Sequence, residues 1–245
     1  MRISKNVVLV TGGATGIGFE LARAFMNAGN TVIICGRRKR KLQEAKAKLP
    51  GLHVKACDLA DPKGRRVLFR WVTKNFSGLN VLVNNAGIQS MIDFTHGPRD
   101  LLRQEDEIAI NLESPIHLSA MFIPRLLRQK EAAIVNITSG LAFTPLAVVP
   151  VYCATKAGMH SFTLSLRHQL ADTSIKVFEA APPTTDTEQD KGGRDAREQK
   201  ERGIPPAQVA DAILKGMRDD RFEIVIGEAT RLRAKPDQMF RMING

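Results

Sequence analysis

Three side chains in the second half of the sequence have the types and spacing needed for proton transfer. Tyr152 and Lys156 lie four residues apart in a stretch with helical periodicity, so their side chains share one helix face. Ser139 follows an apolar run that ends at Thr138, so all three residues can meet at one strand end.

Tyr152 is the only tyrosine in the chain. A phenol has a pKa of about 10, and a nearby ammonium lowers that pKa because it stabilises the phenolate. Tyr152 is thus a candidate acid–base group, with Lys156 as the charge beside it. The alternative interpretation is that Tyr152 is an aromatic residue at a helix start and that Lys156 is a solvated charge.

A glycine-rich turn near the N-terminal end has the properties of a phosphate-binding loop. Residues 11–18 read Thr-Gly-Gly-Ala-Thr-Gly-Ile-Gly and connect an expected strand to an expected helix. The spacing differs from G-x-G-x-x-G, but the physical requirements are the same: a tight turn, close approach of a phosphate, and a helix N-terminus. The turn predicts a dinucleotide site with the contact residues Gly12, Thr15, Gly16, Ile17 and Gly18.

The residue types at the end of the second expected strand indicate which of the two nicotinamide dinucleotides binds. A carboxylate there favours NAD(H), and a basic group favours the 2′-phosphate of NADP(H). The sequence reads Ile34-Cys35-Gly36-Arg37-Arg38, so no acid is available and Arg37 is placed to bind the phosphate. We therefore predict NADP(H). The rest of the basic run, up to Lys41, is expected to form the solvated first turns of a helix that extends to about residue 48.

Short β-branched runs alternate with longer helical stretches along the chain, which is the pattern of βαβ units. Several of these runs are continuously apolar, as in strands covered on both faces. We expect an α/β fold: a single-domain, Rossmann-like, doubly wound parallel β-sheet with helices on both faces, formed by residues 1–245. The expected strands are residues 6–10, 31–35, 53–56, 81–83, 133–138, 176–179 and 223–226. The expected helices include residues 17–28, 64–76, 108–127, 151–170 and 206–217.

Two segments depart from this pattern. Ten of the sixteen residues from 188 to 203 are charged and their only aliphatic side chain is Ala196, so the segment cannot contribute to a core. It is either a solvent loop or a mobile substrate lid, which would extend to residue 205. Residues 224–242 mix apolar and basic side chains, and we expect them to pack on this domain or on a neighbouring subunit rather than to take part in chemistry.

Composition excludes several classes of protein. The 245 residues are 43% hydrophobic and 25% charged, as in globular proteins, and no apolar run approaches the ~20 residues that span a bilayer. Without a signal-peptide pattern, we expect a cytoplasmic protein. The three cysteines and five histidines lack metal-ligand spacing, so no metal site is expected. A net charge of +11 is compatible with a nucleic-acid or anionic-surface binder, although no aromatic residue lies close to the basic run.

Several separated motifs together resemble the short-chain dehydrogenase/reductase family. In chain order they are Thr11-Gly12-x-x-x-Gly16-x-Gly18, Asn84-Asn85-Ala86-Gly87, Asn111, Ser139 and Tyr152-x-x-x-Lys156. Their order and spacing are similar to the compact, single-domain branch of this family over nearly the whole chain. In one departure, Pro182-Pro183 stands where that family has Pro-Gly, which stiffens the turn and removes an N–H.

The resemblance implies roles for individual residues. Tyr152 would protonate a carbonyl oxygen or deprotonate an alcohol, Ser139 would orient that oxygen, and Lys156 would bind the nicotinamide ribose and lower the tyrosine pKa. Asn111 would hold a water in the proton relay. Other implied cofactor contacts are Asp58 and Leu59 at the adenine, Asn84, Ala86 and Gly87 along the cleft, and Thr187 at the nicotinamide carboxamide. Asp58 is alternatively a helix cap near Asp61.

We expect an NADP-dependent oxidoreductase that interconverts a carbonyl and an alcohol in a small-molecule substrate. The resemblance implies a homodimer or homotetramer, with no membrane span and no specific nucleic-acid partner. One alternative is a non-catalytic NADP-binding sensor or scaffold on the same fold, although such a protein does not need all of Asn111, Ser139, Tyr152 and Lys156. A weaker alternative, an anionic-surface or nucleic-acid binder, depends on the net charge alone.

Overall fold

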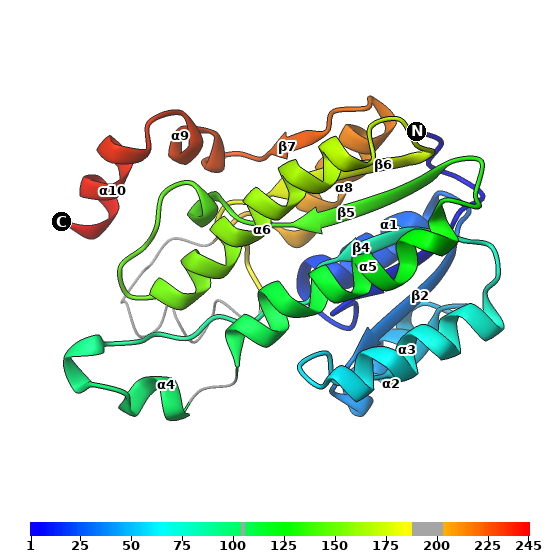
Figure 1. The fold of residues 1–245 in the computed structure, drawn as a ribbon, viewed down its shortest axis with the longest axis horizontal. Helices are drawn as coiled ribbons and strands as arrows, with labels where there is room; N and C mark the ends of the chain where they lie inside the picture. The colour runs from blue at the N-terminus through cyan, green and yellow to red at the C-terminus, as the bar shows by residue number, and fades with distance from the viewer. Residues whose placement is uncertain (104–105, 188–202) are drawn as a thin grey trace.

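One parallel β-sheet forms the centre of the protein (Figure 1). The computed structural model describes residues 1–103, 106–187 and 203–245. Within these residues, seven strands lie in the order β3-β2-β1-β4-β5-β6-β7, and neighbouring strands are parallel. The strands are β1 (Val7–Thr11), β2 (Thr31–Gly36), β3 (His53–Ala56), β4 (Leu79–Asn84), β5 (Ala132–Ile137), β6 (Ile175–Ala181) and β7 (Glu223–Val225).

Helices cover both faces of the sheet because its strands are apolar on both sides. In β1, Val8 and Val10 pack into one core and Leu9 into the other, as alternate side chains of a strand must. The first core contains α1 (Gly16–Asn27), α2 (Lys39–Lys48) and α8 (Pro206–Arg218). The second contains α3 (Pro62–Asn75), α5 (Ser114–Leu126) and α6 (Pro150–Gln169). The predicted doubly wound α/β fold is confirmed.

The predicted elements differ from the observed ones mainly at their ends. α3 begins two residues before its predicted start because the Asp61 side chain accepts a hydrogen bond from Lys63 N at 2.8 Å, and Pro62 suits the first helical position. β4 begins at Leu79 rather than at residue 81. Asn80 is a poor strand former, yet its Oδ1 accepts the Val7 N–H at 2.9 Å and ties β4 to β1.

The sequence does not predict five short elements that follow strands or lie between them. They are the 3₁₀ turns η1 (Phe94–His96) and η3 (Gly140–Ala142) and the helices α4 (Arg99–Arg103), α9 (Ala229–Ala234) and α10 (Pro236–Asn244). Figure 1 shows α4, α9 and α10 beyond the end of the sheet to which the strand arrows point. They therefore surround the end at which doubly wound proteins bind ligands.

The predicted helix 108–127 consists of two parts. Its first turn is the π-helix η2 (Ala109–Glu113), and α5 follows directly. Most of the predicted lid, residues 188–202, lies outside the described residues. Beyond it, Ile204 forms a parallel bridge with Thr185. No helix in the described ranges is long and apolar enough to cross a membrane.

Candidate active site

A cavity of about 1220 Å³ lies at the carboxyl ends of the strands. Ligand pockets commonly measure ~300–1,000 Å³, so this cavity has room for more than one small ligand. The predicted site residues that line it are Gly12, Thr15, Gly16, Ile17, Gly18, Arg37, Asp58, Leu59, Ala86, Gly87, Ser139, Tyr152, Lys156 and Thr187. The two others, Asn84 and Asn111, lie behind the lining.

The glycine turn lies tightly against the end of β4. Gly12 has a φ of +64°, and a Cβ there would lie 2.8 Å from Ala86 Cα. Thr11 Oγ1 accepts hydrogen bonds from the backbone N–H groups of Asn85 at 2.9 Å and Ala86 at 3.0 Å. The chain therefore needs glycine at position 12, both for the left-handed conformation and for the close approach.

The N-terminus of α1 directs its first backbone N–H groups toward this turn, and within the described residues no side-chain cap from Thr15 occupies them. Thr15 precedes the helix but makes no capping hydrogen bond, and the first turn has no acidic residue. Instead, Thr15 Oγ1 accepts a hydrogen bond from Arg38 Nη2 at 3.2 Å. Unsatisfied N–H groups at a helix N-terminus attract anions. Together with the missing glycine side chains, this arrangement fits a pyrophosphate.

Gly18 provides a direct test of this close packing. A Cβ at Gly18 would lie 2.5 Å from both Gly12 O and Asn85 Nδ2. We expect Gly18→Ala to destabilise the protein by about 1–3 kcal/mol and lower Tm by about 2–10 °C. The matched control is Gly78→Ala, whose Cβ would lie 3.6 Å from its nearest neighbour, Val7 Cγ2. Thermal unfolding followed by circular dichroism gives the Tm of both variants. Equal Tm values would contradict the close packing at Gly18.

The opposite end of the cavity is basic. Arg37 and Arg38 both line the cavity and are exposed, although the sequence predicts only a solvated helix start for Arg38. Asp58 also lines the cavity, and its Oδ1 accepts the Ala60 N–H at 3.0 Å. Asp61 is the residue that caps α3. Asp58 is therefore not the helix cap that the alternative interpretation required.

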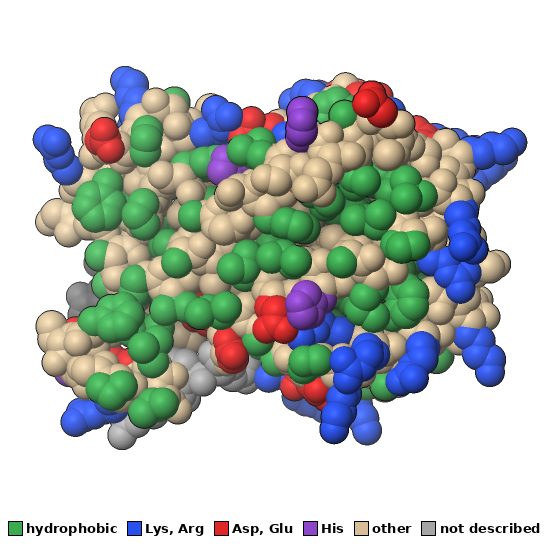
Figure 2. Space-filling model, in the orientation of Figure 1, with side chains coloured by type: hydrophobic (Ala, Val, Ile, Leu, Met, Phe, Trp, Pro, Cys, Tyr) green, Lys and Arg blue, Asp and Glu red, His purple; other side chains and the backbone are tan. Residues whose placement is uncertain are grey.

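The positive charge of the protein is concentrated beside this end. Residues 37–74 contain thirteen Lys and Arg and three Asp and Glu, which gives a net charge of +10. Figure 2 shows Lys and Arg side chains gathered over α2 and α3. On α3, Lys63, Arg66 and Arg70 are exposed. We call this surface the basic face.

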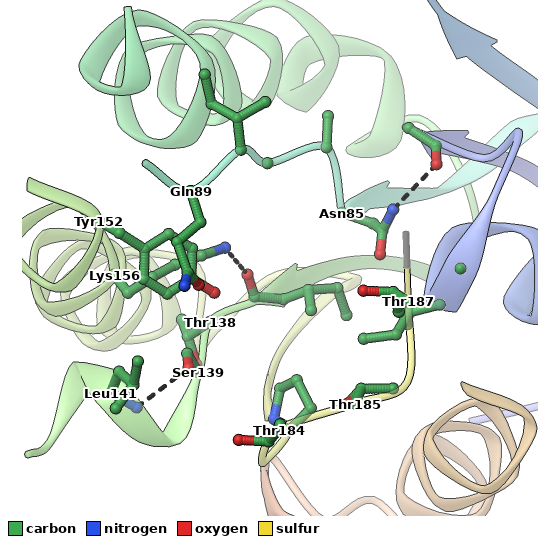
Figure 3. Close-up of a pocket in the computed structure, with 18 of the residues that line it drawn as sticks. Asn85, Gln89, Thr138, Ser139, Leu141, Tyr152, Lys156, Thr184, Thr185 and Thr187 are labelled. Carbon is green, nitrogen blue, oxygen red and sulfur yellow. Dashed lines mark hydrogen bonds between the residues drawn. The ribbon is translucent and has the colours of Figure 1, made fainter. Parts of the chain in front are cut away.

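Tyr152, Lys156 and Ser139 lie together at one wall of the cavity (Figure 3). Tyr152 and Lys156 project from the start of α6, and Lys156 Nζ lies 5.6 Å from the centroid of the Tyr152 ring. Lys156 Nζ also donates to Ile137 O at 2.8 Å, at the end of β5. Ser139 Oγ accepts the Leu141 N–H at 3.1 Å, which fixes the serine at the start of η3.

Burial controls the protonation of Lys156. Its side chain is only 4% exposed, and this burial lowers the pKa of its ammonium from 10.5 to about 8. No carboxylate forms an ion pair with it among the described residues. Lys156 thus places a positive charge beside the phenol at neutral pH and loses that charge in mildly alkaline solution.

Asn111 lies inside the π-helix η2, behind the cavity wall. Its Oδ1 accepts the Ile88 N–H at 2.9 Å, and its Nδ2 donates to Ile88 O at 2.8 Å and to Thr155 Oγ1 at 3.2 Å. These bonds tie η2 to the strand-end segment and to α6. π-Turns occur frequently at functional sites, because the extra residue changes the direction of the side chains.

Of the two adjacent asparagines at the end of β4, Asn85 lines the cavity and Asn84 does not. Asn84 Nδ2 donates to Asn136 Oδ1 at 2.8 Å and to Ser119 Oγ at 3.2 Å, so Asn84 joins β4 to β5 and α5. Asn85 Nδ2 instead donates to Thr11 O at 2.8 Å and faces the cavity (Figure 3). The period-two alternation of a strand explains why neighbours point to opposite sides.

The C-terminal helices form a wall that the sequence analysis did not assign to the site. Arg231 and Leu232 of α9 and Met239, Met242 and Ile243 of α10 line the cavity. The spacing of the last three residues, i, i+3 and i+4, is the signal that could have identified an apolar helix face. Residues 224–242 therefore pack on their own domain, which is one of the two expected arrangements. They also shape the cavity.

The fold and this site define a class: Rossmann-like oxidoreductases. Within that class, the chain belongs to the short-chain dehydrogenase family, which it matches over residues 6–198. Members of this family use NAD(H) or NADP(H).

Individual proteins show the same relationship over the whole chain. The sequence is 50% identical to the uncharacterized oxidoreductase DltE of Bacillus subtilis (strain 168), over 100% of this chain and 98% of that protein. A solved short-chain dehydrogenase from Streptomyces avermitilis is 25% identical with a TM-score of 0.85, over 98% of this chain and 95% of that one. The closed form of serine dehydrogenase complexed with NADP+ is 27% identical with a TM-score of 0.77, over 86% and 88% of the two chains.

Proposed function

We propose that this oxidoreductase is NADP-dependent and interconverts a carbonyl and an alcohol by hydride transfer, with Tyr152 as the acid–base group. One observation carries the proposal: a single cavity has Tyr152, Lys156 and Ser139 at one wall and two arginines at the other end. The chain is proposed to act as a single domain of residues 1–245, with residues 188–205 as a substrate lid. By analogy with the family, it is proposed to form a homodimer or homotetramer in the cytoplasm.

The residues around the cavity suit a nicotinamide dinucleotide, which supplies or accepts the hydride when it is bound. Gly12 to Gly18 and the first N–H groups of α1 would hold its pyrophosphate, because the glycines of this turn carry no side chain that would keep a phosphate from the backbone. Asp58 and Leu59 would contact the adenine, and Arg37 would contact the 2′-phosphate. Ala86, Gly87, Lys156 and Thr187 would hold the nicotinamide half.

In the direction of reduction, Tyr152 donates the proton. Its hydroxyl hydrogen bonds the carbonyl oxygen of the substrate and transfers the proton as negative charge develops on that oxygen. Ser139 Oγ donates a second hydrogen bond to the same oxygen and orients it. Lys156 favours the phenolate that remains on Tyr152. Asn111, through its bonds to Ile88 and Thr155, holds the helix turns behind Tyr152 and is the proposed site of a relay water.

Two features support NADP(H) rather than NAD(H). The sequence at the end of β2, residues 34–38, contains Arg37 and Arg38 and no acidic residue, and a guanidinium binds a phosphate dianion through two parallel hydrogen bonds. Arg38 is already directed toward the glycine turn by its bond to Thr15. The related serine dehydrogenase structure, at 27% identity, is a complex with NADP+.

The test is a panel of aldehydes, ketones, sugars and acyl thioesters, scored by consumption of NADPH or NADH. We expect turnover of at least one carbonyl class and a lower KM for NADPH. Arg37→Ala and Arg38→Ala should each raise the KM for NADPH by about 10- to 100-fold and leave that for NADH nearly unchanged, because each removes one charge-assisted contact.

Lys39 provides the matched control. It lies next in sequence to Arg38, is exposed, and does not line the cavity. Lys39→Ala should leave the ratio of the two KM values as it is in the native protein. A native preference for NADH, or undiminished discrimination in both arginine variants, would disprove the assignment of NADP(H).

A further inference from the structure

Beyond the proposed reaction, we infer that the substrate is a carbonyl compound with an aliphatic body and a carboxylate, and that Arg231 binds this carboxylate. The inference rests on the proposed function and names the substrate class of that same cavity. It starts from the wall formed by α9 and α10, which lies apart from the glycine turn and the basic end of the cavity.

α9 is held directly against the turn that carries Ser139. A Cβ on Gly140 would lie 2.8 Å from Leu232 Cδ1 and 2.9 Å from Ala229 Cβ, so helix and turn are in close contact. Thr144 Oγ1 also donates a hydrogen bond to Leu232 O at 2.8 Å. Arg231 precedes Leu232 on this helix and lines the cavity. α9 therefore places Arg231, an exposed residue, near the turn that carries Ser139.

Arg231 has no internal partner in the part of the chain that the structure describes. No acidic side chain or carbonyl there accepts a hydrogen bond from its guanidinium, whereas Arg233, two residues later, holds both oxygens of Glu223 at 2.5 and 2.8 Å. An arginine at a cavity wall without an acid partner is suited to an anionic ligand. A guanidinium matches a carboxylate through two parallel hydrogen bonds.

Glu228 is the acidic residue nearest to Arg231 along this wall. It lies one helical turn before Arg231, about 4.5 Å along the axis, and forms no ion pair with it. A Cβ on the adjacent Gly227 would lie 3.4 Å from Pro183 Cγ, so the chain just before α9 lies close to the proline turn. The substrate carboxylate is expected on the side of Arg231 away from Glu228, because two carboxylates repel each other.

The part of the cavity formed by α10 and η3 carries apolar side chains. Met239, Met242 and Ile243 of α10 and Leu141 and Leu146 near η3 line this part of the cavity. Methionine side chains adapt to ligands of varied shape. Figure 2 shows hydrophobic side chains gathered over the projection that carries α10. A flexible aliphatic chain suits this surface, whereas a sugar would leave its hydroxyl groups without partners there.

The kinetic test compares 6-oxohexanoate with hexanal, which differ only in the terminal carboxylate. In the native protein with NADPH, kcat/KM should be at least about 10-fold higher for 6-oxohexanoate. Arg231→Gln should remove this advantage by raising the KM for 6-oxohexanoate while hexanal is unaffected. Arg241→Gln is the matched control, because Arg241 is exposed on α10 and does not line the cavity. It should retain the native preference.

A binding measurement separates this inference from the proposed reaction. Titration calorimetry with NADP+ present should show hexanoate binding at least about 10-fold more tightly than hexan-1-ol, and Arg231→Gln should abolish the difference. The carboxylate assignment is overturned if the native protein binds hexanoate and hexan-1-ol equally well. It is also overturned if Arg231→Gln weakens the binding of both probes by the same factor. Tighter binding of 6-aminohexanoate than of hexanoate overturns it in favour of a zwitterion that also uses Glu228. Absence of turnover with every carbonyl compound would contradict the reaction, while the calorimetry still decides the ligand class.

Discussion

Replacing Tyr152 by phenylalanine should lower kcat by about 10³-fold while the Kd for NADPH changes less than about threefold. The substitution removes one hydroxyl and keeps the aromatic ring against Lys156, so the cavity wall is preserved. General acid–base catalysis contributes about 10²- to 10⁴-fold to enzymatic rates, and no second phenol in the chain can replace it. Stopped-flow or steady-state NADPH consumption gives kcat, and fluorescence titration gives Kd.

Ser161→Ala is the control for this experiment. Ser161 is an exposed residue of the same helix, α6, and does not line the cavity. Removal of its hydroxyl should leave kcat within about twofold of the native value. A Tyr152→Phe variant that keeps full activity would rule out the mechanism, and a variant that loses NADPH binding would show that Tyr152 acts mainly in holding the cofactor.

Replacing Lys156 by methionine should make the cofactor-free protein more stable and nearly inactive. Burial of the ammonium lowers the pKa of Lys156 from 10.5 to about 8, so the folded state near pH 7 bears a charge that it disfavours. A pKa decrease of this size corresponds to about 3 kcal/mol. Loss of the hydrogen bond to Ile137 O offsets about 1 kcal/mol of this gain in stability. We expect the free energy of unfolding of Lys156→Met to be about 2 kcal/mol higher than that of the native protein, and its activity to be at least about 10²-fold lower.

The stability difference should depend on pH in a defined direction. Because the folded-state pKa lies below the unfolded one, the unfolded chain binds more protons between pH 8 and 10.5. The cost of burying Lys156 is fully present below about pH 8 and disappears as the pH rises toward 10.5. The advantage of Lys156→Met should therefore shrink over this range. Urea unfolding of both proteins at several pH values measures this difference. Subtracting one curve from the other removes the opposing effect of Cys35 and Cys57, whose pKa values are raised by desolvation.

Lys215→Met is the comparison for the stability measurement. Lys215 is exposed on α8, so its loss should change stability by less than about 0.5 kcal/mol at every pH. If Lys156→Met is less stable than the native protein at pH 7, the contacts of Lys156 stabilise the fold by more than the burial of its charge destabilises it. The prediction of a more stable variant is then wrong.

The sheet and its helices could be predicted because local sequence determines them. Short apolar runs rich in β-branched residues, such as those of β1 and β5, are typical of strands that are buried on both faces, and the glycine turn favours a strand before it and a helix after it. The residues brought together at the carboxyl ends, such as Ser139 with Tyr152, follow from the parallel topology. The roles of these residues in catalysis remain predictions.

The parts that escaped prediction depend on contacts between distant segments. Nothing near Asn111 in the sequence encodes a π-turn, which here is bounded by Glu113 and its ion pair with the buried Arg65 at 2.5 Å. Likewise, α9 is positioned by its contact with Gly140, nearly ninety residues away along the chain. Arg231 could not be assigned to the cavity until that contact was known. Short helices gain their stability from tertiary packing rather than from their own sequence.

The basic face has a consequence for the rate at which ligands arrive. A field from ten net positive charges reaches roughly 10 Å into a solution of 0.1 M salt, well beyond any single contact. An anionic dinucleotide diffusing toward the protein is drawn to α2 and α3 before it meets the glycine turn. We therefore expect the surplus charge to raise the frequency of productive encounters, while the residues inside the cavity determine the strength of the final complex.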